Sequence, residues 1–403
     1  MKKALALTLS LCLLSGAMLS GCGGSAADTA TDETAAEEAD TSEAAGDVIK
    51  IGVLQPMTGS YAAGGAIETE GIKIANEERP TVTLDGVEYT IELVEADNKS
   101  DKVEASTAAQ RLIENDGVVA IIGSYSSVPS IGAGEAIKAG EIPAIGVSCT
   151  NPLVTEGNDW YFRVCFIDPY QGTAMAHYAY EELGAAKVGV AYDVASDYST
   201  GLAQYFMEEF KTLTGDDASI VEATYQTGDQ DFSAQITNLA AADPDCIFAP
   251  GNYTECALLI KQARQLGVEL PILGGDTWEI DDFIEVGGDE VDGVVFSIFF
   301  DSNADLSSKT GEFVQNYRDA NNAEPAGVTA LAYDAYMLLC DALEACGTTE
   351  HTALRDAIAA SEYEGVTGFT SFDENGDPSK PAVIKTVNVA DKTFDYVTTI
   401  SAE

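Results

Sequence analysis

Short apolar runs alternate with helix-like segments along most of this chain, and no other sequence feature limits the possible folds as strongly. In residues 118–152, two apolar runs at 118–122 and 143–147 enclose a segment that opens with serines and a proline. Continuous apolar runs are typical of parallel strands that are buried on both faces. Serine and proline are favoured at the start of a helix. The alternation therefore predicts an α/β fold in which helices connect parallel strands.

The alternation occurs in two successive series, which predicts two lobes of similar construction. The second series starts after Asp168-Pro169, where an extended segment is broken. Roughly 350 residues follow the start of the first apolar run, which is more than one core usually serves. We expect three crossings between the lobes, near residues 166, 275 and 376, whereas two tandem domains would need only one. The expected lobes are doubly wound parallel sheets joined by a three-strand hinge, with the ranges 48–166 plus 276–375 and 167–275 plus 376–403.

Residues 1–22 have the features of an export signal. Two lysines precede an apolar stretch that ends at about Met18, and small residues follow. The segment Leu19-Ser20-Gly21-Cys22 resembles the bacterial lipobox, in which the cysteine is lipidated. This resemblance implies lipidation at Cys22 and an exported lipoprotein that is anchored to the outer face of the cell membrane. A leader with an incidental cysteine is the alternative.

Acidic residues greatly outnumber basic ones, and this imbalance limits the possible partners. The whole chain has 67 Asp and Glu residues against 20 Lys and Arg residues. Such a charge disfavours nucleic acid and anionic lipid headgroups as partners, but it permits a small buried ligand. Residues 23–47 consist mainly of small and acidic residues, a composition that predicts a disordered tether. We expect the folded part to be a monomer.

The sequence contains no motif that would indicate a metal site or an enzyme. Its cysteines form no C-x-x-C pair and it has only two histidines, so a zinc site or a Cys–His nucleophile is poorly supported. The G-x-S-x-G, H-E-x-x-H, P-loop and Rossmann patterns are also absent. We therefore expect no catalytic residues, no metal and no cofactor. The cysteines that follow the leader could form disulfides or stay buried as thiols, and they are Cys149, Cys165, Cys246, Cys256, Cys340 and Cys346.

Two turns rich in hydroxyl side chains follow neighbouring predicted strands. Ser126 and Ser127 lie in the first turn, and Ser148 and Thr150 lie in the second. Open α/β sheets bind ligands at the carboxyl ends of their strands, and a helix N-terminus favours a negatively charged group. The two turns therefore predict a binding site for a small zwitterion. Helix capping and turn formation are the alternative roles of these side chains.

Eight segments, in order along the chain after the tether, resemble those of the type I solute-binding proteins of ABC importers. The resemblance is to the leucine/isoleucine/valine-binding branch of this family. The segments are IGVLQPMTGSYAAGG (51–65), IIGSYSS (121–127), PAIGVSCTNP (143–152), YDVASDYSTG (192–201), GDQDFSAQI (228–236), GNYTECALLIKQARQLG (251–267), GGDTW (274–278) and FTSFDENGD (369–377).

The resemblance implies a site in the cleft between the lobes, which closes over a free amino acid. In this family, Ser126 and Ser127 would lie at the helix N-terminus that holds the ligand α-carboxylate. Ser148 and Thr150 would form the second turn of the same wall. Closure would be linked to binding because the closed form has the higher affinity for the ligand.

The second lobe and the second crossing would supply the remaining contacts. The resemblance implies that Tyr198 closes over the amino acid and that Glu255 pairs with its α-ammonium group, since an unpaired buried charge is costly. Asp276 and Trp278, at the second crossing between the lobes, would complete the site. The family often has an aromatic residue near position 64, where this chain has Gly64-Gly65, so Tyr61 or Tyr125 would take its place. The alternative roles are surface packing for Tyr198, a favourable position in the first turn of a helix for Glu255, and lobe packing for Trp278.

The resulting hypothesis is a non-enzymatic solute-binding lipoprotein that captures leucine, isoleucine or valine and delivers it to ABC permease subunits. Another small solute, such as an amide, a urea-like compound or an aromatic acid, is the alternative within the binding class. A sensory ligand-binding receptor and an exported hydrolase are alternatives from other classes.

Overall fold

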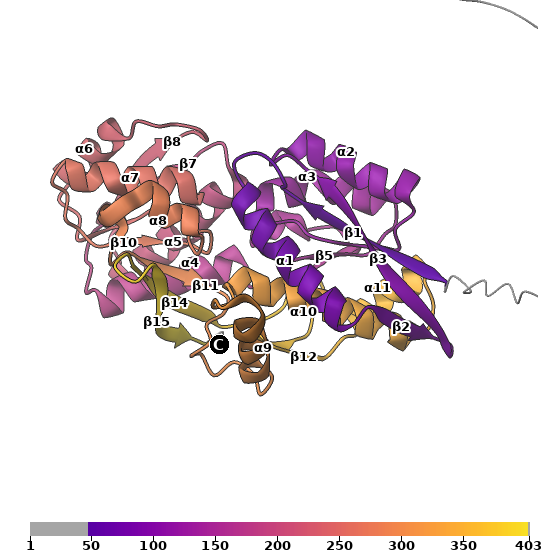
Figure 1. The fold of residues 1–403 in the computed structure, drawn as a ribbon. Helices are drawn as coiled ribbons and strands as arrows, with labels where there is room; N and C mark the ends of the chain where they lie inside the picture. Colours follow the sequence, from indigo (N-terminus) through magenta and orange to yellow (C-terminus); the bar gives the residue numbers. More distant parts are fainter. Residues whose placement is uncertain (1–46, 402–403) are drawn as a thin grey trace, which may run out of the picture. The chain divides into compact units, whose positions relative to one another are not determined.

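Two sheets built from parallel β/α units dominate residues 47–401, the part of the chain that the computed structural model describes (Figure 1). The strands of the first sheet are β1 (Val48–Gln55), β2 (Thr81–Leu84), β3 (Val87–Asp97), β4 (Ala120–Ile122), β5 (Ala144–Gly146) and β6 (Tyr161–Arg163). Their order in space is β2-β3-β1-β4-β5-β6. All neighbours are parallel except the β2–β3 hairpin.

The second sheet repeats this construction. Its strands are β7 (Val188–Asp193), β8 (Ile220–Tyr225), β9 (Cys246–Phe248), β10 (Ile272–Gly274), β11 (Val295–Ile298), β14 (Ala382–Asn388) and β15 (Thr393–Ile400). Their order in space is β15-β14-β11-β10-β9-β7-β8. The strands from β8 to β11 are parallel, whereas β14 and β15 add an antiparallel edge. Two further short strands, β12 (Tyr363–Gly365) and β13 (Gly368–Thr370), form a separate hairpin.

Helices connect the parallel strands, as the alternation of the sequence predicts. The helices are α1 (Ala62–Glu78), α2 (Lys102–Arg111), α3 (Ser127–Ala139), α4 (Asp168–His177), α5 (Asp197–Thr214), α6 (Ser233–Ala241), α7 (Tyr253–Gln265), α8 (Asp281–Gly287), α9 (Thr310–Asn321), α10 (Gly327–Cys346) and α11 (His351–Ala359). The predicted α/β fold, with parallel-dominated sheets in two lobes, is confirmed.

Local sequence explains where these elements begin and end. Strands β4 and β5 are entirely buried, as expected for apolar runs in a parallel sheet covered on both faces. Helix α5 begins after Ser196, whose side chain accepts a hydrogen bond from the N–H of Ser199, and it ends at Gly215 in a left-handed conformation (φ 66°). These are common N-cap and C-cap arrangements.

Helix α10 lies beside α1 although the two helices are far apart in the sequence (Figure 1). Gly71 in α1 faces the carbonyl oxygen of Thr329 in α10, and a Cβ atom at residue 71 would lie 2.3 Å from that oxygen. Glycine is therefore required for this close approach. Through α10, a late segment of the chain packs onto the helix that follows β1.

The second crossing between the lobes comes later in the chain than we expected. We placed it near residue 275 and assigned residues 276–375 to the first lobe, but β11 pairs with β10 and β14 in the second sheet. Gly274 is the last residue of β10, and Gly275 begins the connection that leads through α8 to the adjacent strand β11. Strand β11 finds hydrogen-bonding partners on both of its edges in the second sheet. The other lobe boundaries remain predictions.

The expected leader and the lipidation site Cys22 lie outside the described residues, as does nearly all of the expected tether. All described residues belong to one compact unit, Gly46–Glu403. Across residues 47–401, no helix combines the length and the apolar character needed to cross a membrane.

Candidate functional site

Each sheet has one point where the chain reverses its direction of strand addition. In the first sheet this point lies between β1 and β4, and in the second sheet it lies between β7 and β9. Ligands of open α/β sheets bind at the carboxyl ends of such strand pairs. The helices that follow these four strands start at the N-cap residues Tyr61, Ser126, Ser196 and Asn252. All four N-cap residues line the same cavity.

This cavity, which we call the inter-lobe cavity, is lined by residues from both sheets. Tyr61, Tyr125 and Ser126 come from loops of the first sheet, and the other lining residues come from the second. Its volume is about 10 Å³, which is room for about one water molecule. The lining residues not yet named are Asp193, Tyr198 and Thr277.

Helix N-termini make part of the cavity wall favourable for a negatively charged group. The first-turn N–H groups of a helix have no acceptor within the helix, and the helix dipole places partial positive charge at this end. Ser126, which precedes α3, has a φ of 73°, a backbone conformation that non-glycine residues adopt at a cost. Its side chain does not cap the helix. A ligand carboxylate could therefore bind to the start of α3.

Two buried carboxylates make another part of the wall favourable for a cation. Asp193 is only 5% exposed, lines the cavity and accepts a hydrogen bond from the N–H of Ala195 at 2.8 Å. Glu255 is 4% exposed and accepts hydrogen bonds from the N–H of Gly228 at 2.9 Å and from Nδ2 of Asn252 at 3.0 Å. None of the described residues that line the cavity is basic. A ligand ammonium group could compensate these charges.

Tyr61 lines the cavity together with Asp193. Burial raises the pKa of the Tyr61 hydroxyl above its ordinary value, and the negative charges of Glu255 and Asp193 raise it further. The Ser126 hydroxyl opposes this shift only in part. Tyr61 therefore keeps its proton over the physiological pH range and remains a hydrogen-bond donor.

Tyr198 connects the cavity to a buried polar cluster. Its hydroxyl donates to Oδ1 of Asp276 at 2.9 Å, and Nε2 of Gln171 donates to the same oxygen at 2.9 Å. Gln171 Nε2 also donates to the Ser297 hydroxyl at 2.8 Å. Burial raises the pKa of Asp276 to about 6, and the hydrogen bonds from Gln171 and Tyr198 oppose this rise. Asp276 thus orients Tyr198 from behind the cavity wall.

Tyr125 occupies the space that a side chain at position 64 would need. A Cβ atom on Gly64 would lie 2.2 Å from Cζ of Tyr125, so the aromatic ring replaces a side chain from α1. Within the described residues, the Tyr125 hydroxyl and Oδ1 of Asn252 have no hydrogen-bond partner although both are buried. Unpaired buried polar atoms are costly. Both atoms belong to cavity-lining residues, where polar groups of a ligand could pair with them.

The hydroxyl-rich turns point their side chains mainly into the first lobe. The Ser127 hydroxyl accepts the N–H of Asn151 at 3.1 Å, which ties the two turns together. The Ser148 hydroxyl donates to Oε1 of Glu68. Thr150 is fully buried, and its hydroxyl has no hydrogen-bond partner among the described residues. Ser127, Ser148 and Thr150 therefore lie behind the cavity wall, and their ligand contacts remain predictions.

Trp278 packs inside the second lobe. It is fully buried, and its ring stacks on Phe283 with 4.8 Å between ring centroids. Its neighbour Thr277 lines the cavity and donates a hydrogen bond to the carbonyl of Gly251 at 2.6 Å. Trp278 supports this segment from the core side.

The structure therefore brings only some of the predicted site residues together at the inter-lobe cavity. Tyr61, Tyr125, Ser126 and Tyr198 line the cavity, and Glu255 and Asp276 adjoin it through hydrogen bonds with lining residues. Sequence reasoning missed four lining residues. Ser196 and Asn252 carried a usable signal, because each is a preferred N-cap residue type, and each directly precedes a helix of the structure, α5 or α7. The missed residues are Asp193, Ser196, Asn252 and Thr277.

Glu68 is a further buried carboxyl residue near the cavity wall that the sequence did not predict. It lies on the buried face of α1, fully shielded from solvent, where Nε2 of Gln55 donates to its Oε2 at 2.8 Å. Oε1 of the same Gln55 accepts the N–H of Tyr125 at 2.9 Å. Together with its bond from Ser148, Glu68 thus links the two loops that carry Tyr125 and Ser148. Burial raises its pKa to about 8, against the hydrogen bonds from Ser148 and Gln55.

We expect Glu68 to make the stability of the protein depend on pH. Because its folded-state pKa of about 8 exceeds its ordinary value of 4.5, the folded protein holds a proton that the unfolded chain releases between these values. The stabilisation is complete below the ordinary value and is lost as the pH rises toward 8. Urea denaturation between pH 5 and 8 should show a decline in the unfolding free energy to which Glu68 contributes roughly 1 kcal/mol per pH unit, and Glu68→Gln should lack this contribution. Glu77→Gln, at an exposed position of α1, is the control and should keep the decline.

The described cysteines are all free thiols, and most of them are buried. The sequence left open whether they form disulfides. Among residues 47–401 there is also no cluster of three or more His, Cys, Asp or Glu side chains arranged to hold a metal ion. The chemistry of the inter-lobe cavity is thus that of its carboxylates, hydroxyls, amide groups and aromatic rings.

Comparisons of the sequence and of the fold with known proteins indicate the same family. A family model described as "Periplasmic binding protein" matches residues 48–393. The leucine-binding protein LivK of Thermotoga maritima has a crystal structure with 40% identity and a TM-score of 0.83, covering 88% of this chain and 99% of that one. LivJ of Streptococcus pneumoniae, solved in complex with isoleucine, has 32% identity and a TM-score of 0.79, covering 87% and 99%. A "Leu/Ile/Val-binding protein homolog 1" of Brucella abortus (strain 2308) is 29% identical over 87% of this chain and 93% of its own length.

Proposed function

Given that the chain belongs to the periplasmic binding protein family, in its leucine/isoleucine/valine-binding branch, we propose that it captures a free branched-chain amino acid in the inter-lobe cavity. One observation carries the proposal. Four helix N-caps from both lobes, Tyr61, Ser126, Ser196 and Asn252, line one cavity that also has buried carboxylates beside it. This arrangement offers one wall to a carboxylate and another to an ammonium group, which are the two charges of an amino acid.

In the proposed complex, the ligand carboxylate binds the N-terminus of α3 at Ser126. The ligand ammonium group lies near Glu255 and Asp193 and compensates the charge of these buried carboxylates. The rings of Tyr61, Tyr125 and Tyr198 face the same cavity and would contact the aliphatic side chain. Burial of that side chain would contribute roughly 1.5–3 kcal/mol.

Closure of the lobes would bring the ligand groups of both sides together. An amino acid is far larger than one water molecule, so it would enter only when the lobes separate. Contacts between the lobes near the cavity include an ion pair of Lys102 with Asp197 and a hydrogen bond of 3.4 Å from Asn252 Nδ2 to the carbonyl of Ser60. A ligand that binds both walls would favour this closed arrangement by its differential affinity.

We further propose that the protein is an exported lipoprotein, attached to the membrane through Cys22, that delivers its amino acid to an ABC permease. The sequence of residues 1–22 supports the anchor, and the family supports transport. Radiolabelled palmitate should be incorporated into the wild-type protein during expression in bacteria but not into Cys22→Ser.

Titration calorimetry of the purified folded part against each of the common L-amino acids tests the binding function. We expect leucine, isoleucine or valine to bind with micromolar affinity or better, and charged amino acids to bind much more weakly because the tyrosine-lined wall has no partner for a second charge. If no amino acid binds with a Kd below about 100 μM, which corresponds to roughly −5.5 kcal/mol, the proposed function is wrong.

A further inference from the structure

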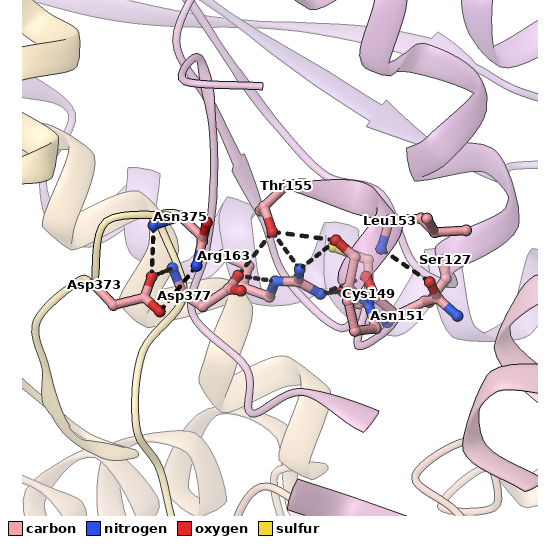
Figure 2. Close-up of polar contacts among 10 residues, drawn as sticks. Ser127, Cys149, Asn151, Leu153, Thr155, Arg163, Asp373, Asn375 and Asp377 are labelled. Carbon is pink, nitrogen blue, oxygen red and sulfur yellow. Dashed lines mark hydrogen bonds and ion pairs between the residues drawn. The ribbon is translucent and has the colours of Figure 1, made fainter. Parts of the chain in front are cut away.

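Arg163, the last residue of β6, is fully buried and uses its whole guanidinium group inside the protein (Figure 2). Its Nε donates to Oδ1 of Asp377 at 2.6 Å. Its Nη1 donates to the carbonyl oxygens of Cys149 at 2.6 Å and Asn151 at 2.8 Å. Its Nη2 donates to the Thr155 hydroxyl at 2.6 Å. One side chain thus holds both the second hydroxyl-rich turn and a distant segment of the chain.

That distant segment is the third crossover, which we define as residues 371–381 between β13 and β14. Within it, Oδ1 of Asp373 accepts the N–H groups of Asn375 at 2.8 Å and Asp377 at 2.9 Å. The carbonyl of Gly376 accepts the backbone N–H of Arg163 at 3.1 Å. The crossover is therefore a well-bonded loop, and Arg163 binds it through both backbone and side chain.

On its other side, Arg163 reaches the inter-lobe cavity through Asn151. The N–H of Asn151 donates to the hydroxyl of Ser127, in the first turn of α3. The Asn151 side-chain amide donates to the carbonyl of Asp197, the first residue of α5 in the second lobe, at 2.8 Å. The turn 148–152 is therefore in contact with the starts of two helices whose N-caps, Ser126 and Ser196, line the cavity.

The buried positive charge of Arg163 is compensated by the carboxylate of Asp377. Burial lowers its pKa, but the charge of Asp377, the thiols of Cys165 and Cys149 and the hydrogen bond to Asp377 outweigh this effect, and the net shift is upward. The guanidinium therefore stays protonated with every contact in place. Arginine suits this role because its planar fork donates in several fixed directions at once, which a lysine ammonium on a flexible stem cannot reproduce.

We propose that Arg163 is a positioning residue for the ligand site, which locks the turn 148–152 to the third crossover so that the cavity wall moves together with the hinge. This inference rests on the proposed function, because it assigns Arg163 to the same amino-acid site. Arg163 is not among the residues that line the cavity, and it acts on the cavity through Asn151. Its removal should therefore lower the affinity of the site and not only the stability of the fold.

The test compares Arg163→Lys with wild type by titration with L-leucine and by hydrogen exchange of the ligand-free protein. Arg111→Lys is the matched control, because Arg111 also binds an aspartate, Asp116, and a backbone carbonyl, but on the exposed surface of the first lobe. We expect Arg163→Lys to raise the Kd at least tenfold and to speed exchange specifically in residues 148–152 and 373–377, with no change in the control. Asp377→Asn keeps the size of the partner and should show the same pattern if Arg163→Lys does not fold.

The double variant Arg163→Lys/Asp377→Asn should have a Kd no higher than that of the weaker-binding single variant, since both substitutions break the same contact between residues 163 and 377. A Kd of Arg163→Lys within twofold of wild type overturns the inference, as does faster exchange spread evenly over the first lobe. If the wild-type protein binds neither leucine nor any other amino acid, the proposed function fails, and the exchange pattern alone then decides whether Arg163 positions the turn.

Discussion

Replacing Glu255 by glutamine is expected to weaken the binding of L-leucine by at least about 100-fold, or roughly 3 kcal/mol. Glutamine has the same shape and can still accept the hydrogen bond from the N–H of Gly228. It lacks the negative charge that a buried ammonium group requires, and leaving that cation unpaired is costly. Titration calorimetry at neutral pH gives the affinity, and a thermal melt shows that the variant is folded.

Glu222→Gln is the matched control for this prediction. Glu222 lies on β8 of the same lobe, where its exposed carboxylate accepts a hydrogen bond from the hydroxyl of Tyr192 at 2.9 Å. The control should bind leucine as wild type does. If Glu255→Gln also binds as wild type does, Glu255 is not the ammonium partner. Asp193→Asn, tested in the same way, then identifies whether the other buried carboxylate has this role.

Replacing Gly64 by alanine is expected to destabilise the fold by roughly 1–3 kcal/mol and to weaken leucine binding. The added Cβ would lie 2.2 Å from Cζ and 2.4 Å from Cε1 of Tyr125, so the buried ring must leave its place in the cavity wall. Alanine normally stabilises a helix relative to glycine by up to about 1 kcal/mol, so a loss here reports the clash. Urea denaturation and calorimetry measure the two effects.

The double variant Gly64→Ala/Tyr125→Ala separates this clash from a general effect on α1. Without the ring, the alanine at 64 has no clash, so the two substitutions should be coupled by about 1–2 kcal/mol in stability. Gly134→Ala is the helix control, because a Cβ at 134 would meet only Nδ2 of Asn158 at 3.8 Å, an ordinary contact. The prediction is wrong if Gly64→Ala and Gly134→Ala have the same stability and leucine affinity.

Much of the fold was predictable because its pattern is local. Continuous apolar runs such as Ala120–Ile122 indicate strands that are buried on both faces, and a Ser or Asn before a helix-like segment indicates where the helix begins. The alternation of these signals specifies parallel β/α units without any long-range information. The same logic could have identified Ser196 and Asn252 as cavity residues, because both precede helices that follow strands.

The position of β11 was not predictable in the same way. The sequence shows an apolar run after a glycine pair, and such a run can continue one sheet or start another. Its assignment depends on which sheet has a free edge beside it, and that edge is provided by β10 on one side and β14 on the other. Strand β14 comes almost 90 residues later in the chain, so no local pattern contains this information.

Side-chain direction separated the predicted site residues that line the cavity from those that do not. Residues of one turn have similar sequence signals, yet Ser126 lines the cavity while the hydroxyls of Ser127 and Ser148 bind Asn151 and Glu68 inside the first lobe. Which way a hydroxyl points depends on the partners that tertiary packing brings near it. Glu68, which attracts the Ser148 hydroxyl, is 80 residues away in sequence.

The sequence by itself therefore determined the α/β class, the two series of β/α units and the strand ends where a ligand would bind, because hydrophobic periodicity and helix capping act over a few neighbouring residues. Only the tertiary structure decided which helix starts meet at one cavity, that Tyr125 fills the place of a side chain at Gly64, and that Arg163 connects the turn 148–152 to Asp377 in the third crossover. These features depend on contacts between segments that are tens to hundreds of residues apart. Such contacts are strong and directional because they are buried. The buried environment forms only when the chain folds.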